Sequence, residues 1–178
     1  MNALTERLRA ESALRSIEQS AAIDDVEWPP TATRIREARA KRELDEAVVA
    51  DRLEMSVESY FDLETYDDEA FTVAALSDLV ALGRIFDVEP RVLLLGMEAE
   101  GVERSITFTD IAEGLRRRLT ASGVTAEALS DEIGYDIEPV LASPDALWEF
   151  NVDGLYCVCT ALALDWVAAL PDLSLETR

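Results

Sequence analysis

The sequence contains no histidine, and it has only two cysteines, seven glycines and six prolines. The absence of histidine removes the most frequent metal ligand and the most frequent general base. Cys157 and Cys159 are two positions apart, a spacing that suits neither a local disulfide nor a CxxC metal site. We interpret both cysteines as small core residues, and we expect no metal and no other cofactor.

Long apolar runs are missing as well. No stretch of about 18 apolar residues is present, and the N-terminus lacks the apolar segment of a signal peptide. Carboxylates are abundant, but none accompanies a histidine, a serine motif or a glycine-rich phosphate loop. We therefore expect a soluble cytoplasmic protein that does not contact a membrane and is not an enzyme.

Basic residues are scarce. The chain has 16 Lys and Arg against 37 Asp and Glu, which gives a formal net charge of −21, and no Lys or Arg occurs between Leu119 and Thr177. Neutralisation of phosphates supplies most of the non-specific affinity for DNA, and a strongly negative field opposes the approach of a duplex. This charge favours a basic partner.

The composition indicates a nearly all-α protein, since glycine and proline are few and β-branched alternation is rare. Apolar residues make up 49% of the 178 residues, enough for a substantial core, and the length suits two small domains. Residues 1–30 read as an N-terminal helical arm with a thin apolar stripe, followed by a linker. The stripe favours docking of the arm on the next domain or on a second subunit.

Residues 44–64 form the central motif, two short helices joined by a tight turn. Asp45 and Ser56 are good N-caps, and the small Ala50 lies where the helices should cross. The stretch resembles the helix-turn-helix of the Xre, or lambda-repressor-like, family. The matching positions are Leu44, Asp45, Val49, Ala50, Leu53, Ser56, Tyr60, Leu63 and Glu64.

The resemblance implies a five-helix domain over residues 31–97. Its first helix would cover residues 34–42, a leucine-rich helix residues 73–86, and a short closing helix would follow. The motif departs from the family in its turn, where Glu54 replaces glycine, and at Glu46, which replaces a glutamine. The face that would enter the major groove carries Glu58, Ser59 and Asp62, so it is acidic.

A second, degenerate copy of this domain is predicted over residues 105–173. Placing Val124 under Leu44 puts Thr125 at the cap and Gly134 at the turn, without a gap for about twenty residues. Its recognition-like helix is interrupted, because Pro139 is tolerated only in the first turn and Pro144 ends the helix. We therefore expect tandem Xre-type domains of which the second has lost DNA reading.

The favoured function is binding of a basic protein, as an antitoxin-like or immunity-like neutraliser or as a DNA mimic. Exposed aromatic residues would support it, with Tyr60, Tyr66, Trp148 and Tyr156 as candidates and core packing as the alternative for each. The predicted partner-binding residues are Glu58, Tyr60, Asp62, Tyr66, Asp67, Asp68 and Glu69.

The alternative function is sequence-specific DNA binding as an Xre-type transcriptional regulator. Phosphates would then be contacted from the basic first helix, with Ser59 nearest the bases; ion pairing with neighbouring acidic helices is the structural alternative for these cations. Family members often dimerise, and the arm or the apolar residues 93–97 would serve a homodimer. The predicted phosphate contacts are Arg34, Arg36, Arg39, Lys41, Arg42 and Arg52.

Overall fold

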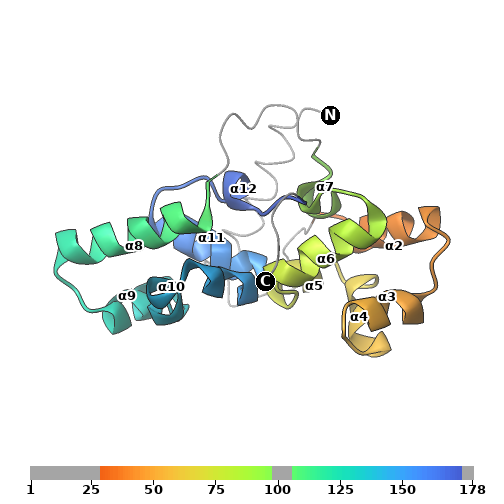
Figure 1. Cartoon of the computed structure of the whole chain (residues 1–178), viewed down its shortest axis with the longest axis horizontal. Coiled ribbons are helices and arrows are strands. Elements are labelled where there is room, and N and C mark those ends of the chain that lie inside the picture. The colour runs from red at the N-terminus through yellow and green to blue at the C-terminus, as the bar shows by residue number, and fades with distance from the viewer. Residues whose placement is uncertain (1–28, 98–105, 174–178) are drawn as a thin grey trace.

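The computed structural model describes residues 29–97 and 106–173, and every regular element in these two ranges is a helix (Figure 1). The all-α prediction is confirmed. The expected N-terminal arm lies outside the described residues, apart from Pro29 and Pro30 at its end.

The first range contains six helices, which are α2 (Thr31–Lys41), α3 (Glu46–Arg52), α4 (Val57–Leu63), α5 (Glu69–Thr72), α6 (Leu76–Phe86) and α7 (Pro90–Leu95). The expected five-helix domain, with its leucine-rich helix over residues 73–86, is partly wrong, because α5 is an additional helix. Ala70 and Phe71 are fully buried, so this segment coils into the short helix α5 to place them in the core. The leucine-rich helix α6 therefore begins only at Leu76, after the exposed Val73.

The second range repeats the same order of elements. They are α8 (Phe108–Ser122), α9 (Ala126–Ile133), α10 (Glu138–Ala142), the 3-10 helix η2 (Pro144–Glu149), α11 (Val152–Ala161) and α12 (Trp166–Ala169). We call the helices from α2 to α7 the first repeat, and those from α8 to α12, including η2, the second repeat.

The predicted helix caps are confirmed. The side chain of Asp45 accepts a hydrogen bond from the backbone N–H of Ala47 at the start of α3, at 3.0 Å. Ser56 Oγ accepts from the N–H of Ser59 in α4 at 3.0 Å, and Thr125 caps α9 in the same way. These bonds satisfy backbone donors that a helix leaves free in its first turn, so the local sequence sets where these helices begin.

Left-handed backbone positions recur at equivalent places in the two repeats. The alignment that places Val124 under Leu44 also pairs Glu43 with Gly123, and the turn residue Glu54 with Gly134; all four have positive φ. A positive φ costs a non-glycine residue free energy, so such residues are rare. Their recurrence at matched positions is strong evidence that the two repeats share one backbone path. The backbone path of two short helices joined by a left-handed turn residue thus occurs in both repeats.

The two repeats meet at their centres. An antiparallel bridge pairs Ala75, the residue before α6, with Asn151, the residue before α11. Leu76 N donates to the carbonyl of Phe150 at 2.8 Å, and the Asn151 amide donates to the carbonyl of Thr72. Because equivalent residues pair with each other, an approximate twofold axis passes between Ala75 and Asn151.

The consequence of this axis is visible in Figure 1, where α3–α4 and α9–α10 lie at opposite ends of the molecule and on the same side of it. The helices α7 and α12 lie together on the other side. One apolar core runs through both repeats. Residues 93–97, expected as an apolar end open to a second subunit, instead bury Leu93, Leu94, Leu95 and Met97 in this core.

Candidate functional site

The exposed side of α4 combines large apolar side chains with carboxylates. Val57 is 48% exposed and Phe61, one helical turn later, is 51% exposed. Glu58 and Asp62 lie next to them in sequence, and Tyr66, just beyond the helix, is 53% exposed. We call these five residues the α4 surface. Residues four apart share a helix face, so Val57 and Phe61 form one apolar stripe.

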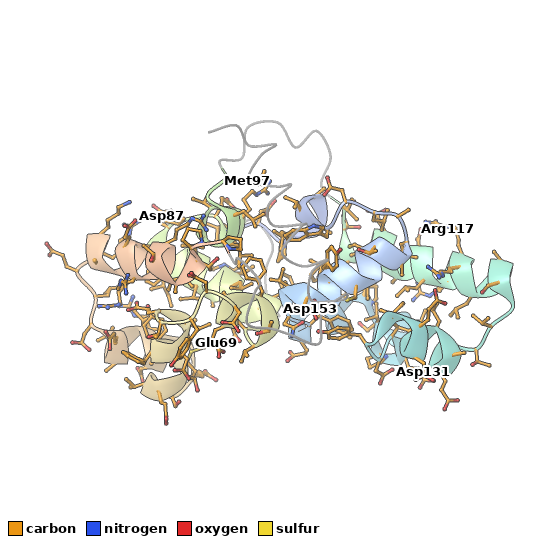
Figure 2. The ribbon with its side chains drawn as sticks, turned by 180° about the vertical axis from the view of Figure 1, so that it is seen from behind. Glu69, Asp87, Met97, Arg117, Asp131 and Asp153 are labelled. Carbon is orange, nitrogen blue, oxygen red and sulfur yellow. The ribbon has the colours of Figure 1, made fainter. Side chains whose placement is uncertain are left out.

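Three carboxylates follow the α4 surface in the chain, Asp67, Asp68 and Glu69, the last of which is labelled in Figure 2. Partial burial, together with repulsion from Asp68 and Asp62, raises the pKa of Glu69. Among the described residues, none of Glu58, Asp62, Asp68 and Glu69 forms an ion pair with Lys or Arg. A cation brought here by a partner would relieve this repulsion.

Asp67 caps the helix α2. Its Oδ1 accepts a hydrogen bond from the backbone N–H of Ala32 at 2.9 Å, in the first turn of α2. The residue before this helix, Pro30, has no side chain that caps it. Asp67 therefore acts as the cap of α2 from a distant point of the chain, in addition to its place beside the α4 surface.

The prediction that Tyr60 is an exposed partner contact is wrong. Tyr60 is fully buried, and its hydroxyl donates to Glu64 Oε1 at 2.5 Å. Burial, and then the carboxylate of Glu64, raise the pKa of Tyr60, so the phenol stays protonated. Tyr156 is buried too, and Trp148 is half-buried with its ring 4.9 Å from that of Phe108. Of the four aromatic candidates, Tyr66 alone is exposed.

Arg39, predicted as a phosphate contact, is an internal residue. Its Nε and Nη2 donate to the two oxygens of Glu64 at 2.6 and 2.7 Å, and Nη2 also reaches Glu46 at 3.1 Å. The bond to Glu64 raises the pKa of Arg39, and a third donor bonds the carbonyl of Leu44. Glu64 is only 4% exposed. This network joins α2 to the turn before α3 and to the end of α4.

Two further predicted phosphate contacts also bond within the protein. Arg34 Nη1 donates to the carbonyl of Leu94 at 2.7 Å, and Arg42 donates to the carbonyl of Phe86 at 2.8 Å and to Asp87. These bonds attach α2 to α6 and α7. Arg36, Lys41, Arg52 and Ser59 remain exposed, the first two on α2 and the others on α3 and α4.

The cations of the second repeat are bound in a similar way. Arg118 on α8 bonds Glu132 and the carbonyl of Ala161, and Arg116 bonds the carbonyl of Leu141. Exposed carboxylates cover the outer side of α9 and α10, at Asp131, Asp136 and Glu138. We call these three residues the α10 surface.

The cysteines fit the structural interpretation. Both are thiols on α11, Cys157 half-buried and Cys159 buried, and burial raises the pKa of Cys159 to about 12. A thiol with that pKa is a weak nucleophile at neutral pH.

Sequence reasoning missed Val57 and Phe61 as site residues. The available signal was their spacing of four on α4, which places them on one helix face. A run of neighbouring aromatic residues, Tyr60 and Phe61, hides that signal, because either one fits a core position. The structure resolves it by burying Tyr60.

Within the described ranges, no group of three His, Cys, Asp or Glu side chains is placed to hold a metal ion. Nor is any helix found there that combines the length and the apolar character needed to cross a membrane. The chain matches no protein-family model, no curated protein and no solved structure.

Proposed function

We propose that this chain is a cytoplasmic helix-turn-helix protein of the Xre-like type that acts by binding a basic protein partner. The single observation that carries the proposal is the α4 surface. In a DNA reader this helix would present Arg, Lys, Asn or Gln to base edges. Here it presents Val57 and Phe61 beside the carboxylates of Glu58 and Asp62.

An apolar centre with a charged border is the usual anatomy of a protein interface. Burial of a Phe side chain contributes about 1.5–3 kcal/mol, which makes Phe61 the natural anchor. The carboxylates of Glu58 and Asp62 beside it select a partner of positive charge and speed its approach. Proteins that act on nucleic acids carry such charge, which supports a role as a neutraliser or as a DNA mimic.

Affinity purification of the tagged full chain from its native cells tests this proposal. Wild type is compared with the double variant Val57→Ala and Phe61→Ala, and with Val124→Ala, which removes an exposed valine of the second repeat. We expect a basic protein to be retained by wild type and Val124→Ala and lost from the double variant. Far-UV circular dichroism checks that all three are folded. Equal retention of the partner by the double variant would overturn the proposal.

DNA binding is the second candidate, and one observation favours it. The two helix-turn-helix units lie on one side of the molecule about an approximate twofold axis, the arrangement that dimeric readers use on paired half-sites. The matching test is fluorescence anisotropy of labelled duplexes, random and from the gene's upstream region, at about 50 and about 200 mM salt.

The charge-reversal variant for this test is Arg36→Glu with Lys41→Glu, because both side chains are exposed and lie outside the Arg39 network. Saturable binding of the upstream duplex that this variant loses would establish DNA binding. Absence of binding by wild type at low salt would exclude it.

A further inference from the structure

We propose that a recess between the two repeats binds an arginine side chain of the basic partner, with Asp136 and Glu149 pairing its guanidinium and two aromatic rings packing against it. The inference rests on the proposed function and adds a second contact to the α4 surface. It concerns a part of the surface that exists only because the two repeats adjoin.

The recess has a volume of about 450 Å³ and takes its walls from both repeats. Val73, directly after α5, comes from the first repeat, whereas Tyr135, Pro139 and Phe150 come from the second. Val73 is 66% exposed, the largest exposure among the big apolar side chains of the described residues. Apolar side chains gathered around an open recess leave area that a partner is able to bury.

Two aromatic rings in the wall are held in fixed positions. The ring centroids of Tyr135 and Phe150 are 5.7 Å apart, with an angle of 30° between the ring planes. The Tyr135 hydroxyl donates to Asp153 Oδ2 at 2.8 Å, and Asn151 Oδ1 lies 3.1 Å from the same hydroxyl. Gly154 leaves room for both rings, because a Cβ there would be 2.8 Å from Tyr135 and 3.0 Å from Phe150. Rings positioned in advance bind a planar group without a further loss of side-chain freedom.

The exposed carboxylates of Asp136 and Glu149 also line the recess. Within the described parts of the chain, neither forms an ion pair with Lys or Arg. Burial raises the pKa of Asp78 against a hydrogen bond from the backbone N–H of Ala75, and the charge of Glu149 raises it further. Glu149 is therefore close enough to repel a second carboxylate, and a cation in the recess would relieve this repulsion.

The combination of rings and carboxylates favours arginine over lysine. A guanidinium is planar and weakly hydrated, packs on aromatic rings and bonds carboxylates through several N–H groups in one plane. Its apolar stem would lie against Val73 and Pro139. Arginine is also a side chain with which proteins bind phosphates, so a partner that acts on nucleic acids would carry it on the surface that a DNA mimic covers.

The recess follows the α4 surface along the chain. Asp68 and Glu69 come after that surface, and Val73 N–H donates to the carbonyl of Glu69 at 2.9 Å. Residues four apart share a helix face, so Glu69 and Val73 lie on one side of α5. A partner seated on the α4 surface is thus able to reach the recess along α5.

NMR spectra of the ¹⁵N-labelled full chain test the recess with small probes, N-acetyl-L-arginine methylamide and its lysine and citrulline counterparts. Citrulline has nearly the shape of arginine and no charge. We expect the arginine probe to shift the backbone amide signals of Val73, Tyr135 and Phe150 saturably, with a Kd on the order of 1 mM for a single side chain. The lysine probe should bind about threefold or more weakly, and the citrulline probe should give no saturable shift.

The recess variant, Asp136→Asn with Glu149→Gln, removes both charges and keeps the oxygen of residue 136 that accepts from Glu138 N–H. It should weaken binding of the arginine probe about 3–20-fold, the range for two partly exposed ion pairs. The matched control, Glu127→Gln with Asp131→Asn, makes the same change of charge on α9 outside the recess. It should change this Kd less than about twofold, because salt screens distant charges.

Affinity purification from the native cells, with the recess variant and its control beside Val57→Ala with Phe61→Ala, separates the two levels of the proposal. We expect the recess variant to retain less of the partner than the control. If wild type retains no basic protein, or if the Val57 and Phe61 variant retains it equally, the proposed function fails and the contact in the recess fails with it.

A partner that depends on Val57 and Phe61 but is retained equally by the recess variant and its control leaves the proposed function standing and overturns this inference. Equal binding of the three probes overturns it as well. So does an arginine Kd that the recess variant changes less than about twofold.

Discussion

The buried network of Arg39, Glu64 and Tyr60 yields the sharpest stability prediction. Replacing Arg39 by leucine would leave the carboxylate of Glu64, which is 4% exposed, with the Tyr60 hydroxyl but without its cation. Loss of one partner of a buried ion pair costs about 3–5 kcal/mol. The Arg39 side chain is 16% exposed, so some water reaches the pair and we take the lower end, about 3 kcal/mol. In a protein of this size that corresponds to a fall in Tm of about 6–12 °C.

The effect of Glu64→Gln on the free energy of unfolding should change sign when Arg39 is also replaced. Glu64→Gln in the wild type leaves the Arg39 guanidinium with the longer ion pair to Glu46 alone and should destabilise the fold. In the Arg39→Leu background the same change removes an uncompensated buried charge and should restore about 2 kcal/mol, because the amide still accepts from Tyr60. The second repeat already has apolar residues at two of the equivalent positions, Leu119 for Arg39 and Val140 for Tyr60.

Urea and thermal unfolding at pH 7, followed by circular dichroism at 222 nm, measure the stability of wild type, of the two single variants and of the double variant. Arg36→Leu, an exposed change on the same helix, is the control and should shift the free energy of unfolding by less than about 0.5 kcal/mol. The reasoning is refuted if Glu64→Gln is equally destabilising in both backgrounds, since the pair would then not be coupled.

Three further outcomes are expected. Glu54→Gly should stabilise the protein by about 1 kcal/mol in urea unfolding, and Gly134→Ala should destabilise it by about as much, because both positions have positive φ. Asn151→Asp keeps the cap of α11 but loses the donor to the Thr72 carbonyl between the repeats, so it should lower stability by about 1–3 kcal/mol, seen as a lower Tm. The raised pKa of Glu69 means that the folded state holds this proton more tightly than the unfolded chain, so stability should fall as pH rises through that pKa. In Glu69→Gln the change of Tm between about pH 4 and pH 7 should be smaller than in wild type. The same dependence of Tm on pH in both proteins would contradict the raised pKa of Glu69.

Local signals carried the predictions that succeeded. A cap needs an oxygen-bearing side chain two or three residues before the N–H that it accepts from, so Asp45, Ser56 and Thr125 are readable from the sequence. The position of Glu54 within the motif predicts the turn there, although this residue is not the usual glycine. Such features depend on a few neighbouring residues, and tertiary packing rarely overrides them.

The predictions that failed depend on contacts distant in the chain. Tyr60 and Phe61 are adjacent aromatic residues, and the one that is buried, Tyr60, packs in the core and donates to Glu64, which Arg39 holds in place. For the basic α2 the sequence leaves phosphate binding and internal ion pairing open, and Arg39 and Arg42 bond to groups that packing brings to them, as the second alternative expects. No local sequence pattern identifies such hydrogen-bond partners.

The join between the repeats has a consequence for how such a molecule diversifies. When two helical units pair as separate identical chains, every substitution is made twice, and the pair dissociates on dilution. Here both units belong to one polypeptide, and Ala75 meets Asn151 at any concentration. One half is therefore free to keep a buried Arg39–Glu64 pair while the other replaces it, and each outer face is able to drift toward its own ligand without disturbing the other.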